Sequence, residues 1–236
     1  MRWSKIIKET GLSFIELFYP RLCVACGAAL LREERDMCLS CHTLLPRFSL
    51  QKEERIALER LFYGRLPLGF VVAHYKFDKR GSVQRVIHAI KYHQCTHLAE
   101  RVGRWLGSAM REIQRDWPVD VVVPVPLHPK KLKSRGYNQS EHFGKGLANA
   151  LQISMETHLV ERVRHTRSQT GMNQRQRWEN VKDAFCCPVS VKGLRVLLVD
   201  DVLTTGSTVE ACGRALVAAG ADLISVAVMA SAFGHR

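Results

Sequence analysis

The chain has 236 residues, which is enough for one well-formed core and a small appendage. Its hydrophobic content of 46% and charged content of 24% are ordinary for a soluble globular protein, and no stretch approaches the ~20 uninterrupted apolar residues of a membrane span. The net charge of +13 favours a polyanionic partner, a description that fits nucleic acid, a membrane surface and a phosphorylated small molecule alike.

The first twenty residues predict an amphipathic helix. Glu16 interrupts their apolar run and no small-residue cleavage site follows, so we expect no secretory signal. Eight cysteines in a chain without an export signal indicate a reducing compartment and argue against a disulfide framework. We therefore expect a cytoplasmic protein.

Four of the cysteines form two Cys-x2-Cys pairs with eleven residues between them: Cys23, Cys26, Cys38 and Cys41. Each pair can turn two thiolates toward one ion, so the pattern predicts a structural zinc site with four cysteine ligands. A catalytic zinc is disfavoured because four thiolates leave no open position. The alternative is four unrelated reduced cysteines. We expect residues 1–48 to hold the helix and this module, and the mixed-charge stretch 49–67 to be a linker.

The middle of the chain alternates between strand and helix patterns. We expect a strand over 70–75, a helix capped by Ser82, a longer helix over 97–115, a strand over 120–126, a helix over 140–150 and a short strand over 158–163. Such alternation is typical of an α/β fold with a mostly parallel sheet.

Basic side chains follow two of these elements. Lys91 ends the helix that starts near Ser82, and the strand over 120–126 leads into Leu127, His128 and the run 130–135. Cations at the end of a parallel strand suit a pyrophosphate, and we take as its candidates Lys91, His128 and Arg135, together with Leu127 at the same strand end. A solvated surface run is the alternative, and we favour it for Lys130 and Lys131.

The segment 164–173 is polar and cationic, with one glycine and almost no apolar residues. It cannot pack as core, so we expect a mobile loop. The candidates for a catalytic role on this loop are Arg164, Arg167 and Gln169.

The most specific signal begins at the apolar run 195–199, which predicts a strand buried on both faces. Two carboxylates follow it, then a run of small polar residues and a helix pattern: Asp200, Asp201, Thr204, Thr205, Gly206, Ser207 and Thr208. The acids suit sugar hydroxyls or a Mg²⁺ shell, and the small residues before a helix suit a phosphate. A plain N-cap at Ser207 or Thr208 beside an acidic pair is the alternative.

This stretch resembles the phosphoribosyl pyrophosphate (PRPP) motif of type I phosphoribosyltransferases. Together with the four-cysteine module, Lys91, the run 135–139 and the segment with Gln169, it makes nearly the whole chain resemble the ComF/GntX family. The resemblance implies a small N-terminal zinc module joined to a type I phosphoribosyltransferase domain, which we place over 68–236.

The same resemblance implies a ligand, PRPP with Mg²⁺ at Asp200 and Asp201, and a role in natural transformation and the use of external DNA. No motif in the sequence identifies the acceptor of a transferase reaction. A rival interpretation keeps the fold without the reaction and makes the protein a nucleic-acid-binding accessory. Its positive charge would then bind single-stranded DNA. DNA-uptake or recombination proteins are the protein partners we expect. The sequence does not fix the oligomeric state.

Overall fold

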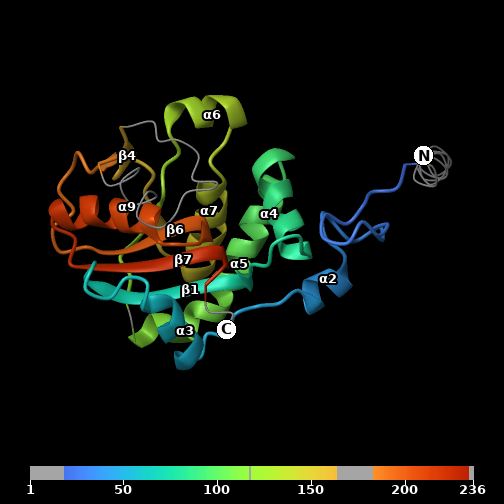
Figure 1. The fold of residues 1–236 in the computed structure, drawn as a ribbon, viewed down its shortest axis with the longest axis horizontal. Coiled ribbons are helices and arrows are strands. Elements are labelled where there is room, and N and C mark those ends of the chain that lie inside the picture. Colours follow the sequence, from blue (N-terminus) through green and yellow to red (C-terminus); the bar gives the residue numbers. More distant parts are fainter. Residues whose placement is uncertain (1–18, 117, 164–182, 234–236) are drawn as a thin grey trace, which may run out of the picture.

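A five-stranded parallel sheet organises the computed structural model, which describes residues 19–116, 118–163 and 183–233 (Figure 1). The strand order is β1-β7-β6-β2-β3, and every neighbouring pair is parallel. The strands are β1 (Leu68–Lys76), β2 (Val121–Pro124), β3 (Ser154–Met155), β6 (Arg195–Leu203) and β7 (Leu223–Ser231). The order confirms the α/β fold expected from the alternating pattern.

Helices cover both faces of this sheet, which explains why its central strands are apolar on both sides. Alternate residues of β1 enter different clusters: Phe70 and Val72 pack on one face, and Val71 and Ala73 on the other. The first face carries α4 (Ser82–Tyr92), α5 (Thr96–Asp116) and α7 (Gln139–Leu151); the second carries α3 (Lys52–Glu59) and α9 (Ser207–Ala218).

Helices α5 and α7 cross in close contact on the first face. A Cβ added at Gly146 would lie 1.9 Å from the carbonyl oxygen of Glu100, so only glycine permits this approach. The crossing fixes α7, whose N-terminus then lies beside the carboxyl end of β6.

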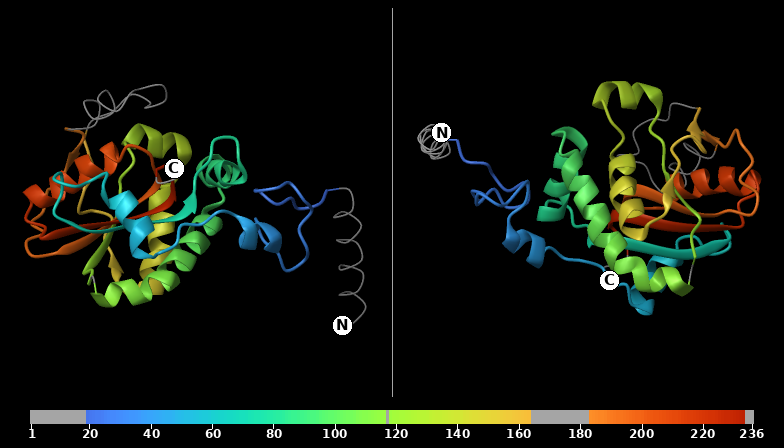
Figure 2. Two further views of the ribbon diagram at one scale, coloured as in Figure 1. Left: turned by 60° about the horizontal axis from the view of Figure 1, so that its bottom comes forward. Right: turned by 180° about the vertical axis from the view of Figure 1, so that it is seen from behind.

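The N-terminal segment stands apart from the sheet. Residues 19–38 extend beyond α4, at the opposite end of the molecule from α9, and lead into the short helix α2 (Leu39–Leu44) (Figure 2). The remaining short elements are α6 (Pro129–Arg135) and the antiparallel pair β4 (Glu161–Arg162) and β5 (Phe185–Cys186).

Several expected boundaries change in the structure. Ser82 does not cap its helix: Gly81 is the N-cap, and the Ser82 hydroxyl accepts a 2.8 Å hydrogen bond from Arg85. The basic run 130–135 is helical, and the strand expected over 158–163 covers only β4. The stretch 49–67 contains α3, and its Leu58 and Phe62 are buried against the sheet.

The predictions for the first twenty residues, apart from Tyr19 and Pro20, lie outside the described residues. Among the helices that are described, none combines the length and the apolar character needed to cross a bilayer.

Candidate functional site

A pocket of about 610 Å³ opens at the carboxyl ends of β2 and β6. This edge is where ligands bind in open α/β sheets. Strand β2 ends at Pro124, opposite Val199, so β6 runs on past its neighbour on that side. Asp200 and Asp201 therefore lie within β6, beyond the end of β2, and both line the pocket.

Asp200 accepts two hydrogen bonds at Oδ1. The hydroxyl of Ser140 donates one at 3.1 Å, and the backbone N–H of Asp201 donates the other at 2.8 Å. Burial raises the pKa of Asp200 to about 7, and the neighbouring charge of Asp201 acts in the same direction. The backbone N–H, Lys91 and Ser140 oppose that rise. The carboxyl group is thus balanced between its two protonation states near neutral pH.

Asp201 is held by two side chains that come from different helices. The ammonium of Lys91, on α4, lies 2.9 Å from Oδ2, and the amide of Gln139, on α7, donates a 2.5 Å hydrogen bond to the same oxygen. Arg135 donates in turn to the Gln139 carbonyl oxygen and lies over the Tyr92 ring at 5.3 Å. One polar network therefore joins α4, α6, α7 and β6.

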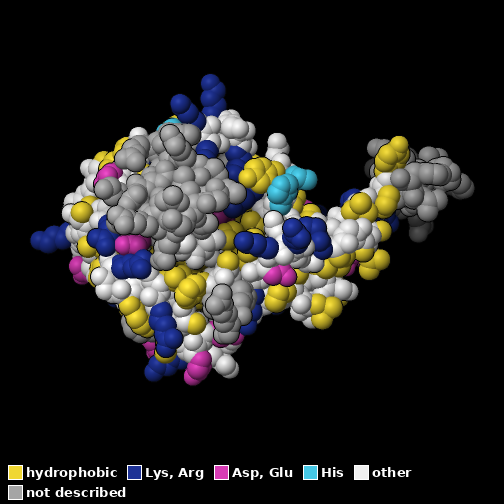
Figure 3. Space-filling model, viewed as in Figure 1, with side chains coloured by type: hydrophobic (Ala, Val, Ile, Leu, Met, Phe, Trp, Pro, Cys, Tyr) yellow, Lys and Arg dark blue, Asp and Glu magenta, His cyan; other side chains and the backbone are white. Residues whose placement is uncertain are grey.

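Further cations surround the acids. Lys131 and Arg162 also line the pocket, and Arg162 lies over the Phe185 ring at 5.2 Å. Burial lowers the pKa of Lys131, and the charges of Arg162, Arg135 and Lys91 lower it further. Figure 3 shows lysine and arginine side chains gathered over α4 and next to it. Such a set of like charges at a sheet edge suits a polyanion.

The loop after the acids reaches α9 through Gly206, which has φ +75. An added Cβ there would lie 2.9 Å from the Phe62 ring, so both the backbone angle and the space require glycine. Gly206 is the N-cap and makes no side-chain capping bond, so the alternative of an N-cap at Ser207 or Thr208 is wrong. The first N–H groups of an α-helix have no partner within the helix, so a helix start at this position suits an anion.

The residues predicted to bind the 5′-phosphate fall into two groups. Thr204 and Thr208 line the pocket, while the hydroxyls of Thr205 and Ser207 lie 3.0 Å apart and hydrogen-bond to each other.

The four residues predicted to bind pyrophosphate also lie in two different places. Lys91, Arg135 and Leu127 line the pocket. His128 is the N-cap of α6, where its Nδ1 accepts a 3.1 Å hydrogen bond from the N–H of Lys130. The loop candidates Arg164, Arg167 and Gln169 lie outside the described residues.

Sequence reasoning missed three contacts that shape the site. The sequence pattern gives a helix start at 140, the run 135–139 only as part of the family resemblance, and a strand over 158–163, so it does not connect Ser140, Gln139 or Arg162 with the acids. Gln139 and Ser140 reach the acids because α7 folds against the end of β6, and Arg162 reaches the pocket from β4. No local pattern signals such partners, although the polar residues that open α7 indicate that its N-terminus faces a polar site.

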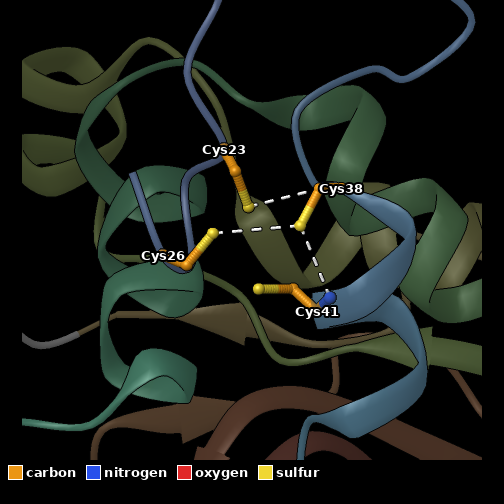
Figure 4. Close-up of side chains that lie close together, drawn as sticks. All are labelled: Cys23, Cys26, Cys38 and Cys41. Atoms are coloured by element: carbon orange, nitrogen blue, oxygen red, sulfur yellow. Dashed lines mark hydrogen bonds between the residues drawn. The ribbon is translucent and has the colours of Figure 1, made fainter. Parts of the chain in front are cut away.

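The four predicted metal ligands come together at the N-terminal module. Figure 4 shows their side chains converging, Cys23 and Cys26 from the first loop and Cys38 and Cys41 from the start of α2. All four sulfur atoms lie within 4.8 Å of one another, and those of Cys26 and Cys38 are 3.8 Å apart. A tetrahedron with 2.3 Å metal–sulfur bonds has edges of about 3.8 Å, so the cluster could hold a zinc ion.

Backbone N–H groups support these sulfurs. The N–H of Cys38 donates to the Cys23 sulfur at 3.3 Å, and the N–H of Ala28 donates to that of Cys26 at 3.4 Å. Such donors stabilise thiolate charge, which a zinc site requires. The donor set and its spacing therefore fit the metal that the sequence predicts.

Comparison with known proteins identifies the family. DNA utilization protein YhgH of Salmonella typhi is 33% identical over 152 residues, which cover 63% of this chain and 67% of that protein. Competence protein F of Haemophilus influenzae is 34% identical over 163 residues, covering 68% of this chain and 66% of that protein. The chain belongs to the ComF/YhgH family. The resemblance seen in the sequence is confirmed, and the chain spans about two thirds of the length of these relatives.

A family model described as the phosphoribosyl transferase domain matches residues 138–234 of this ComF/YhgH protein, beginning at the N-cap of α7 and including α9 and β7. That range contains both acids and the loop that follows them. Among solved structures, glutamine PRPP amidotransferase from B. subtilis aligns with a TM-score of 0.37 and 24% identity, over 55% of this chain and 26% of that one. The fold class rests on the strand order and the family match.

Proposed function

We propose that this ComF/YhgH protein binds PRPP with Mg²⁺ in the pocket at the end of β6, and that it acts in DNA uptake or utilisation during natural competence. Two relatives are named for competence and for DNA utilization, and the match to the phosphoribosyl transferase domain supports PRPP as the ligand. The cytoplasm is the compartment we assign, because eight cysteines without a disulfide framework suit a reducing environment.

The network around Asp201 carries this proposal. Lys91 and Gln139 already orient the Asp201 carboxylate, and Ser140 orients the Asp200 carboxylate. A site whose polar groups are fixed in advance loses little freedom when it binds.

Each part of PRPP has a matching part of the pocket. Asp200 and Asp201 would take the ribose hydroxyls, directly or through Mg²⁺, which prefers carboxylate oxygens. The stretch 204–208 and the start of α9 would take the 5′-phosphate. Lys91 and Arg135, with the backbone at Leu127, would take the pyrophosphate. His128 contributes to this end by starting α6, which carries Arg135.

A transferase reaction at this site would break the bond between the ribose C1 and the pyrophosphate oxygen, and the lone pair of the acceptor would form the new bond. The cations near Lys91 would stabilise the leaving pyrophosphate. Exclusion of water would protect the positive charge at C1, and we assign that role to the predicted loop with Arg164, Arg167 and Gln169.

The test uses full-length protein with Mg·PRPP. Calorimetry measures binding, and an assay with candidate bases and amines measures pyrophosphate release. Binding with release supports a transferase; binding without release for any acceptor supports a protein that uses PRPP as a regulatory ligand. Absence of binding contradicts the proposal.

One observation favours a second function, nucleic-acid binding. A cleft of about 580 Å³ lies between the N-terminal module and α5, and its walls include Arg21, Arg35, Arg101 and Arg104. Arginines in a groove bind phosphate backbones and release counterions. Single-stranded DNA and DNA-uptake or recombination proteins are the partners we predict. Fluorescence anisotropy with labelled single-stranded DNA separates the two functions, since a nucleic-acid-binding accessory would bind it without releasing pyrophosphate.

A further inference from the structure

Helix α4 is the shared wall between the four-cysteine module and the proposed PRPP pocket. One stripe of the helix, with Gln84, His88 and Lys91 at helical spacing, lines the pocket. A crevice of about 350 Å³ lies on the module side, between Val24 and α4, and it is lined by Gln84 and His88 as well. A displacement of α4 would therefore change both cavities.

The module holds α4 through a specific hydrogen bond. Arg85 donates from Nε to the carbonyl oxygen of Ala25 at 2.6 Å. Ala25 is fully buried and lies between the metal ligands Cys23 and Cys26. The backbone that accepts this hydrogen bond therefore has its position set by the same turn that directs two sulfurs into the cysteine cluster.

Apolar packing completes the attachment. Cys23, Ala25 and Met37 of the module belong to one buried cluster with Val86 and Ile90 of α4. On its far side the same helix places Lys91 against Asp201 at 2.9 Å. The path from the cysteine cluster to the ribose-binding acid thus consists of one buried turn, one hydrogen bond and one helix.

We propose that the four-cysteine module positions α4, so that metal binding at its cysteines and ligand binding at Asp200 and Asp201 are energetically linked. The ligand half of this inference rests on the proposed function. Linkage is reciprocal: if the metal increases PRPP affinity by some factor, PRPP increases metal affinity by the same factor. Couplings of this kind are typically about 5- to 150-fold.

The test compares Arg85→Met with a matched control, Arg111→Met. Arg111 also donates from Nε to a backbone carbonyl oxygen, that of Ala150 at 3.1 Å, but it joins α5 to α7 and touches neither the module nor the pocket. Methionine keeps most of the arginine stem in both variants, and elemental analysis confirms that each retains its zinc.

In zinc-loaded protein we expect Arg85→Met to weaken Mg·PRPP binding about fivefold or more, and to accelerate hydrogen exchange in α4 relative to α9 of the same sample. Arg111→Met should change neither quantity. Saturating Mg·PRPP should also strengthen zinc retention against a chelator in the wild type, and less so in Arg85→Met. Equal PRPP affinities and equal α4 exchange in the two variants would overturn the inference.

Hydrogen exchange keeps the two proposals separable. If wild-type protein fails to bind Mg·PRPP, the proposed function is wrong. The positioning role of the module is then supported by faster α4 exchange in Arg85→Met and overturned by unchanged exchange. If wild-type protein binds Mg·PRPP and Arg85→Met binds it equally well, with unchanged exchange, the linkage alone is wrong.

Discussion

The ammonium group of Lys91 lies 2.9 Å from a carboxylate oxygen of Asp201, at 23% and 12% side-chain exposure respectively. The pair joins the end of α4 to the end of β6, two segments that are distant in sequence. Because Gln139 donates to the same oxygen, Asp201 keeps an oriented partner when Lys91 turns to another anion. Lys91 is therefore placed to exchange the carboxylate for a pyrophosphate.

Lys91→Met should weaken Mg·PRPP binding about 10- to 150-fold, because one charge-assisted hydrogen bond contributes roughly 1.5–3 kcal/mol. Calorimetry measures the effect. Lys145→Met is the control, since Lys145 is exposed and pairs with Glu100 outside the pocket. Wild-type affinity in Lys91→Met would remove this lysine from the site.

The raised pKa of Asp200, about 7, makes ligand binding pH-dependent. Mg²⁺ and ribose hydroxyls need the ionised carboxylate, and the ionised fraction falls as the pH drops through 7. At pH 6, one unit below that pKa, about a tenth of the groups are ionised, so affinity should fall about tenfold between pH 8 and pH 6. Calorimetry at the two pH values measures this.

Asp200→Asn is the control for that experiment. Asparagine keeps an acceptor oxygen for Ser140 and for the N–H of Asp201 but does not titrate. The phosphates of PRPP titrate near pH 6 and give a background slope, which the variant should retain. A variant with the same pH dependence as the wild type would show that Asp200 is not the responsible group.

The acids and their strand were predictable because a buried β-branched run ending in carboxylates is a local pattern. The structure adds that β6 continues through both acids, since β7 pairs with it as far as Leu203 although β2 stops at Pro124. The cysteine cluster was predictable for the same reason: knuckle spacing is local, and the sulfurs converge as expected.

The partners of the acids were not predictable, because tertiary packing selects them. Gln139 and Ser140 reach β6 only after α5 and α7 cross. The N-cap of α9 differs from the one that the alternative interpretation gave, for a different reason. Serine and threonine are good N-caps by preference, but Gly206 takes the position because Phe62, from a segment expected to be a linker, fills the space beside it.

Purified protein should contain one zinc per chain, held by the four cysteines of the module. Zinc binding in such sites supplies roughly 10–16 kcal/mol of apparent folding free energy, so Cys38→Ser should lose the metal and unfold the module. Elemental analysis and limited proteolysis measure the two effects. Cys95→Ser, which changes a half-buried cysteine outside the cluster, should retain the zinc. Zinc-free wild-type protein that resists proteolysis would contradict this assignment.

Single-stranded DNA binding should depend strongly on salt. If lysines and arginines outside the phosphate loop contact the phosphates of the DNA, affinity should fall about 300-fold between 50 and 200 mM salt for about six phosphate contacts. Anisotropy titrations at the two concentrations measure the slope, and replacement of Arg101 and Arg104 by Gln should reduce it. Equal affinity at both concentrations would show that the positive charge does not carry the interaction.

The central claim is that Asp200 and Asp201 bind PRPP, and calorimetry of the double alanine variant with Mg·PRPP tests it most directly. The variant should keep its fold, checked by circular dichroism and zinc content, because both acids lie at the pocket edge of the sheet and Asp200 is costly to ionise there. Thr205→Ala should weaken binding less, since backbone N–H groups still reach the phosphate. The account predicts no measurable binding by the double variant; binding as tight as that of the wild type would contradict it.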